Sequence, residues 1–296
     1  MAVGEMIEPT ASAHSEKAEA VGWINLKRSA RFSVRTLERR SLTPLFSHSL
    51  IPYLAAVSIS QHILFILLGV VLPAVLFITT YRRRKAGGGR LRWTRKMKVG
   101  LYYGNGGLLW GMALLVLAVW FFSGRPFTEI GLGWGTTPYD AMAVLTLSAF
   151  VFLYLFDLYL EAGNEESRDE TRREFAKLGF MPTTSTEFLH FIFLAVAAGV
   201  GEEIVYRGFM VTYLTELLGP GTLPTIGALI IPAIAFGLGH FYQGGRAVLK
   251  IVAMAVLFGF FYLRTNTLWP LMLLHAAIDV FGGLMSWYLL GRRLED

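Results

Sequence analysis

The sequence has no cysteine among its 296 residues. A disulfide, a catalytic thiolate and a cysteine-bound metal are therefore excluded, although this absence does not fix the compartment. Charged residues are also scarce, at 16% of the chain, whereas soluble domains carry about 25%. Hydrophobic residues make up 54%, and the mean hydropathy is +0.51. This composition favours a membrane-embedded helical protein over soluble domains.

Charge is missing over long stretches, such as the interval between Arg40 and Arg82. A chain crosses lipid as helices of about 20 mostly apolar residues, because lipid cannot hydrogen-bond to exposed backbone groups. We expect spans at 59–81, 104–123, 138–160, 187–218, 222–243, 246–264 and 268–290. Residues 44–57 are expected to be interfacial or re-entrant, unless an eighth span lies within 44–62. The predicted fold class is all-α, a polytopic transmembrane helix bundle with 7–8 spans.

The formal net charge of +6 reflects clustered basic residues. The loop after the first expected span contains Arg82, Arg83, Arg84, Lys85, Arg90, Arg92, Arg95, Lys96 and Lys98. Because Lys and Arg concentrate in cytoplasmic loops, this loop is predicted to be cytoplasmic. The positive charge therefore indicates membrane topology, and no nucleic-acid partner is expected. Residues 1–40 are interpreted as a disordered, basic N-terminal tail.

Three polar motifs interrupt the apolar segments of the C-terminal third. They are Gly201-Glu202-Glu203-Ile204-Val205-Tyr206-Arg207, Phe236-Gly237-Leu238-Gly239-His240 and His275-Ala276-Ala277-Ile278-Asp279. An ionised side chain near the centre of a membrane helix costs about 2.5–3.5 kcal/mol on insertion scales. These groups must therefore face one another or a water-filled cavity, and ionisable residues inside a membrane are by default functional.

Residue spacing suggests partners for these side chains. Glu203 and Arg207 lie four residues apart on one helix face and are predicted to form an ion pair. Glu202 is rotated about 100° from Glu203, so it is expected to point into the cavity. His275 and Asp279 are also four apart and share a face.

The residue types indicate hydrolysis. A carboxylate in a pocket of low dielectric can act as a general base toward water. A neutral histidine can share that work, and a second histidine can stabilise an oxyanion. Phe236 and His240 share a helix face, and the neighbouring glycines permit close helix approach.

The three motifs resemble the CAAX prenyl protease type II family, also called CPBP or Abi, whose pattern is EExxxR, FxxxH, then HxxxN or HxxxD. The resemblance covers about residues 185–290. It implies a glutamate-dependent intramembrane endopeptidase that requires no metal or other cofactor. It also implies that Glu202 activates water with help from His240, that His275 and Asp279 build the oxyanion site, and that Glu203, Arg207 and Phe236 order the pocket.

One position departs from the HxxxN form of the pattern. An asparagine would offer a neutral amide donor, whereas Asp279 can donate only when it is protonated. The alternatives are that Asp279 stays protonated in an apolar site or that it orients His275.

The resemblance also suggests a domain organisation and a setting. We expect N-terminal spans and loops over 41–180, a catalytic core over 185–290 and a cytoplasmic tail over 291–296. The expected partners are the lipid bilayer and a membrane-anchored peptide or protein substrate, such as a prenylated C-terminal tail. The expected location is a bacterial cytoplasmic membrane, with the active site open toward the cytoplasm.

Two other functions fit the same residues. One is a non-catalytic membrane protein of the bacteriocin-immunity or scaffold type that retains the pocket. The other is a zinc-dependent metalloprotease that uses His240, His275 and a glutamate as ligands, although the sequence lacks an HExxH helix.

Overall fold

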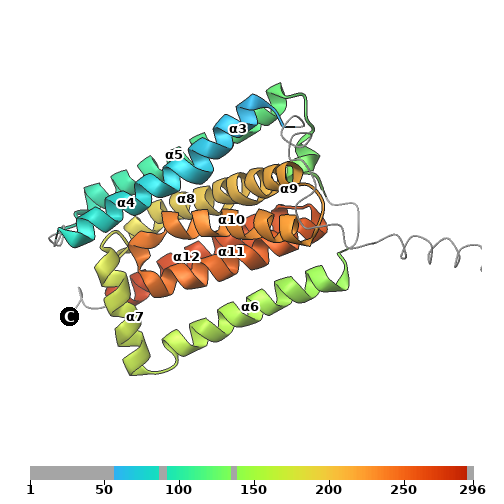
Figure 1. The fold of residues 1–296 in the computed structure, drawn as a ribbon. Helices are drawn as coiled ribbons and strands as arrows, with labels where there is room; N and C mark the ends of the chain where they lie inside the picture. Colours follow the sequence, from blue (N-terminus) through green and yellow to red (C-terminus); the bar gives the residue numbers. More distant parts are fainter. Residues whose placement is uncertain (1–56, 87–91, 135–138, 292–296) are drawn as a thin grey trace, which may run out of the picture. The chain divides into compact units, whose positions relative to one another are not determined.

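The structure, a computed structural model, describes residues 57–86, 92–134 and 139–291. All described residues belong to the unit Leu50–Asp296. Every regular element in these ranges is helical, which confirms the all-α prediction (Figure 1). Seven of the helices are long and apolar enough to cross a membrane. The described part of the chain is therefore an all-helical bundle, and its seven apolar helices indicate an integral membrane protein.

The helices of the first half account for three spans and a surface helix. They are α3 (Ile59–Phe65), the π-helical η1 (Ile66–Val71) and α4 (Leu72–Lys85) in one continuous span, then α5 (Arg95–Phe122), the short η2 (Phe127–Ile130), α6 (Ala141–Ala162) and the surface helix α7 (Glu165–Leu178). Figure 1 shows α7 running across the ends of the spanning helices.

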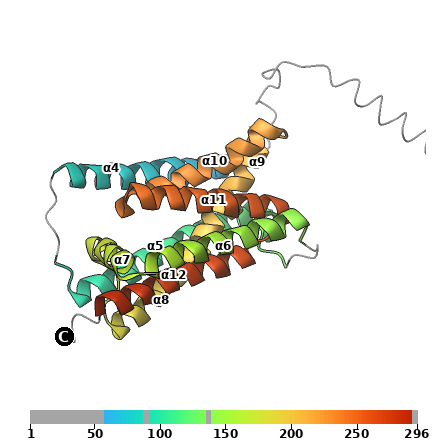
Figure 2. The same ribbon diagram turned by 90° about the horizontal axis from the view of Figure 1, so that it is seen from below.

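The second half supplies four more spans. One is built from α8 (Ser185–Glu202), the π-helical η3 (Glu203–Val211) and α9 (Thr212–Leu218); the others are α10 (Thr222–Gly239), followed by the short η4 (Phe241–Gln243), then α11 (Gly245–Thr265) and α12 (Trp269–Gly291). Helix α8 packs against α5 and α12, and α10 packs against α11. Figure 2 shows α8 beside α12 from a second direction.

One predicted boundary is confirmed and another is wrong. Ser58 is extended and caps the helix that begins at Ile59, where the first span was predicted to begin. The alternative of an eighth span within 44–62 falls mostly on residues outside the described ranges. The second span begins at Arg95 instead of 104, because the Thr94 side chain caps the helix there and accepts a hydrogen bond from the amide of Met97. The predicted tail over 1–40, the segment 44–56 and residues 292–296 lie outside the described residues.

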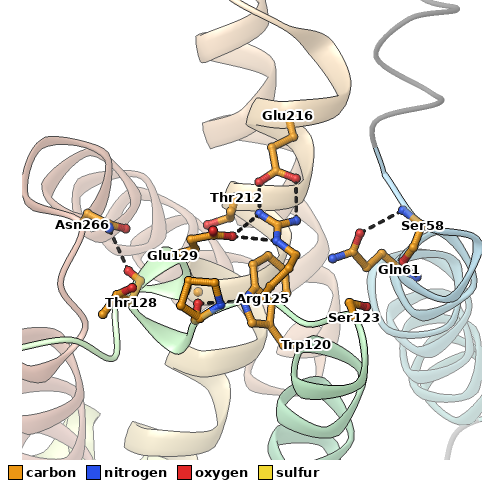
Figure 3. A network of polar contacts seen from close by, with 12 residues as sticks. Ser58, Gln61, Trp120, Ser123, Arg125, Thr128, Glu129, Thr212, Glu216 and Asn266 are labelled. Atoms are coloured by element: carbon orange, nitrogen blue, oxygen red, sulfur yellow. Dashed lines mark hydrogen bonds and ion pairs between the residues drawn. The ribbon is translucent and has the colours of Figure 1, made fainter.

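A charged network closes the end of the bundle where α5 ends and α9 finishes. The guanidinium of Arg125 donates two hydrogen bonds to Glu216, one of them at 2.8 Å, and one of 2.7 Å to Glu129 (Figure 3). Its Cζ also lies 3.8 Å from the centre of the Trp120 ring. These contacts hold the turn after α5 against the end of the long helix α8–η3–α9.

Helices α8 and α12 approach closely at a glycine. A Cβ at Gly199 would lie 2.4 Å from the backbone nitrogen of Ala276 and 2.6 Å from its Cα. Backbone atoms cannot move aside as a flexible side chain can, so the helices would have to separate. Because His275 precedes Ala276, this contact also fixes the position of His275 along α8.

We expect Gly199→Ala to lower the free energy of unfolding by about 1–3 kcal/mol, as overpacked interiors do. The matched control is Gly111→Ala on α5, where an added Cβ meets nothing within 4 Å and the loss of a helical glycine is neutral or favourable. Thermal unfolding in detergent measures both variants. Equal midpoints for the two would contradict the close approach.

Candidate active site

One cavity of about 1110 Å³ lies among the spanning helices, and residues of α4, α5, α6, α8, α10 and α12 contribute to its wall. Glu202, His240, His275 and Asp279 all line it. These four residues come from three segments that are far apart in the sequence. The fold therefore brings the side chains predicted to be catalytic around one shared space.

A buried trio forms the base of this arrangement. Arg207 Nη1 donates a hydrogen bond of 2.7 Å to Glu203 Oε1, in agreement with the predicted ion pair. His275 Nδ1 donates to the same oxygen at 2.8 Å. The side chain of Glu203 is fully buried, and those of Arg207 and His275 are only 2% and 5% exposed. Glu203 therefore joins two helices and fixes the orientation of the His275 ring.

The other nitrogen of His275 lies near two more carboxylates. His275 Nε2 is 3.7 Å from Glu202 Oε2 and 3.9 Å from Asp279 Oδ2, distances beyond a hydrogen bond. The side chain of Glu202 is 13% exposed and that of Asp279 is 34% exposed. Nε2 thus faces two acidic groups that also line the cavity, while the orienting bond comes from Glu203 instead of Asp279.

His240 caps the C-terminal end of α10. Its Nδ1 donates to the carbonyl oxygen of Phe236 at 2.8 Å, which leaves Nε2 as an unprotonated acceptor in the neutral ring. In that form Nε2 can accept a hydrogen bond from a group in the cavity, which His240 lines.

Phe236 packs between the polar groups. Its ring centre is 4.5 Å from that of His240 and 6.1 Å from that of His275. The Cζ of Arg207 lies 5.0 Å from the same ring. Phe236 thus packs against Arg207 of the buried ion pair and against both cavity histidines.

The EExxxR motif spans the point where the long helix changes from α-helical to π-helical hydrogen bonding. Residues 203–211 form a π-helix and are all buried. Single π turns inside α-helices occur frequently at functional sites. Nothing in the residue types of this segment predicted the wider turn.

A second buried ion pair was not predicted as such. Lys98 Nζ on α5 donates to Glu187 Oε2 at 2.9 Å and to the carbonyl oxygen of Met181 at 2.9 Å. Glu187 also accepts a 2.8 Å hydrogen bond from the amide of Thr183. The pair fastens the connection between α7 and α8 to α5, and Met181 of that connection lines the cavity.

A protein metal site needs several His, Asp or Glu side chains directed at one point. Within residues 57–86, 92–134 and 139–291, no group of three or more His, Asp or Glu residues is placed to hold a metal ion.

A protein-family model matches part of the chain. Residues 184–281 match the family model described as type II CAAX prenyl endopeptidase Rce1-like. No curated protein and no solved structure matches the chain. The matched range contains all three motifs, from Glu202 to Asp279, and ends before the last turns of α12. The resemblance seen in the sequence is thus confirmed: the chain carries a type II CAAX prenyl endopeptidase Rce1-like domain over residues 184–281.

Proposed function

We propose that this protein is a glutamate-dependent intramembrane endopeptidase that cleaves a peptide bond in a membrane-anchored substrate. The observation that supports it best is the shared cavity, in which Glu202 lies beside His275 and in the same wall as His240. Membership of the matched domain in a CAAX-type protease family supports peptide hydrolysis as the reaction class.

In this proposal Glu202 is the general base. Its carboxylate removes a proton from a water molecule as the water oxygen bonds to the scissile carbonyl carbon. The unprotonated Nε2 of His240 accepts a hydrogen bond from the same water. When the tetrahedral intermediate collapses, the C–N bond breaks and Glu202 returns the proton to the leaving amine. The products are a carboxylic acid, which then loses its proton to water, and an amine, and the Glu202 carboxylate is restored.

His275 and Asp279 are proposed to serve the oxyanion. In its imidazolium form His275 donates through Nδ1 to Glu203 and through Nε2 toward the cavity. A donor held in place before the reaction stabilises developing negative charge effectively, and loss of one such donor typically costs about 10²–10³-fold in rate. Asp279 adds a second donor only when it is protonated.

The expected setting is a bacterial cytoplasmic membrane. Arg83, Arg84 and Arg92 line the cavity at the end where α4 finishes and α5 begins. Because basic residues favour the cytoplasmic side, the proposed cavity opens toward the cytoplasm. A prenylated C-terminal tail anchored in the inner leaflet is the proposed substrate type.

Cleavage of a farnesylated fluorogenic peptide by the purified protein in proteoliposomes tests the proposal. Cleavage at one peptide bond, giving a new amine and a new carboxylate, is the expected result. Intact peptide with every lipid anchor tried would count against the endopeptidase.

The zinc alternative predicts a different response to chelation. We expect kcat/KM to stay within about twofold after exhaustive treatment with EDTA and 1,10-phenanthroline, because the proposed steps use only side chains and water. A thermolysin-type metalloprotease treated in parallel shows that chelation was effective. Loss of activity that added zinc restores would establish the metalloprotease instead.

A further inference from the structure

Three arginines line the cavity at the end where α4 finishes and α5 begins, which we call the mouth. The proposed chemistry does not use them. Arg83 and Arg84 belong to the last turn of α4, and Arg92 lies just before α5. All three line the same cavity as Glu202 and His240. Arg82 and Lys85, which flank the first two in sequence, are absent from its wall.

Arg84 and Trp93, the residue that follows Arg92, belong to one aromatic cluster. Arg84 Nη2 donates to the carbonyl oxygen of Tyr242 at 3.2 Å, and its Cζ lies 4.9 Å from the centre of the Phe241 ring. The Tyr242 ring is 6.0 Å from the ring of Phe180, which is 6.3 Å from that of Trp93. Trp93 follows Arg92 in the chain. The rings of Tyr242, Phe180 and Trp93, in tilted and edge-on contact with one another, all line the cavity between Arg84 and the residue that follows Arg92.

The same cluster reaches the proposed active site. The ring centre of Tyr242 is 6.0 Å from that of His240. The aromatic cluster therefore connects the surroundings of His240 with those of Arg84.

No described carboxylate lies in an ion pair with these three arginines, Arg83, Arg84 and Arg92. On the α6 side of the cavity the situation is opposite, because Asp157 and Glu161 are both paired with Lys250, at 2.6 Å and 3.0 Å. The acidic side chains on the α6 side thus have a cationic partner, whereas the three arginines have no described carboxylate partner.

We propose that Arg83, Arg84 and Arg92 form a binding site for the free carboxylate at the C-terminus of the substrate. This inference rests on the proposed function and adds a requirement to it: the cleaved peptide must end in a free carboxylate near the scissile bond. Guanidinium groups bind carboxylates through charge-assisted, often bidentate hydrogen bonds. The position inside the cavity wall favours the substrate over lipid headgroups, which would meet the outward-facing Arg82 and Lys85 equally well.

Binding without turnover tests this site separately from catalysis. The protein carries Glu202→Gln, so that it does not cleave, and sits in nanodiscs of zwitterionic phosphatidylcholine. Two fluorescent farnesylated peptides differ only in a C-terminal carboxylate or carboxamide. We expect the carboxylate peptide to bind about tenfold more tightly, and we expect salt to weaken that preference.

Variants identify the residues responsible. Arg83→Gln combined with Arg92→Gln should abolish the preference for the carboxylate while leaving the affinity for the carboxamide within about twofold. Arg82→Gln is the matched control and should keep the full preference. Equal thermal midpoints of the variants confirm that each is folded.

Three results would overturn the site. They are equal affinity for the two peptides, a preference that survives the Arg83→Gln and Arg92→Gln pair, and a preference that disappears when phosphatidylglycerol replaces part of the phosphatidylcholine. The last result would assign the arginines to lipid phosphate. If the carboxylate preference is found but wild-type protein cleaves neither peptide, the binding site stands and the endopeptidase proposal fails.

Discussion

Glu202→Gln should reduce kcat/KM for peptide cleavage by about 10²–10⁴-fold, the range that a general base contributes. Glutamine keeps the size of the side chain but cannot take a proton from water. Yield and thermal midpoint should stay near those of the wild type. No hydrogen bond joins the Glu202 side chain to another described residue, and its ion-pair contact with His275 is 3.7 Å long. Initial rates with a farnesylated fluorogenic peptide, together with the melting curve, measure both effects.

The control is another carboxylate of the same cavity. Asp157 lines the cavity wall but is paired with Lys250 at 2.6 Å on its α6 side. Asp157→Asn should change kcat/KM by less than about fivefold, as expected for a partly exposed ion pair. If both variants lose activity equally, the cavity needs negative charge in general and Glu202 is not the base. If neither does, and Glu202→Gln also retains full function in cells, a non-catalytic role becomes the better account.

Arg207→Ala should be the most destabilising single change in the domain, lowering the free energy of unfolding by about 3–5 kcal/mol. The substitution leaves Glu203 buried between helices without its cationic partner. A large loss of purified yield and a lower thermal midpoint in detergent are the expected measurements. Activity should fall as well, because Glu203 also holds the ring of His275.

A paired variant separates the fold from the chemistry. Glu203→Leu combined with Arg207→Met removes both charges and fills a similar volume, and such replacements of buried ion pairs are often neutral or stabilising. The double variant should recover most of the lost yield but remain inactive, because His275 Nδ1 has lost its acceptor. Recovery of activity along with yield would show that the Glu203–His275 hydrogen bond is dispensable.

Much of this arrangement follows from local sequence. The all-helical fold and its spans follow from apolar runs, and the Glu203–Arg207 pair follows from helical spacing. In both cases the interacting groups lie within one segment, where periodicity determines geometry.

Contacts between segments were harder to predict. Spacing grouped His275 with Asp279, yet its orienting partner is Glu203 on another helix, a relation that depends on how α8 and α12 pack at Gly199. The pairing of Lys98 with Glu187 likewise joins two spans. It gives the charge of Lys98 a partner inside the first turn of α5, so the helix can start at Arg95. The π-helical turn after Glu202 had no signal in the sequence.

The most direct test asks whether residue 202 faces water inside the bilayer. The chain has no natural cysteine, so a single Glu202→Cys variant can be labelled with a membrane-impermeant methanethiosulfonate reagent. Leu273→Cys is the control, since Leu273 lies two residues from His275 but is 75% exposed on the outer surface of the bundle. We expect the Glu202→Cys thiol to react from the cytoplasmic side and the Leu273→Cys thiol to remain unmodified in lipid. A Glu202→Cys variant that reacts only after denaturation would contradict a solvent-filled active site.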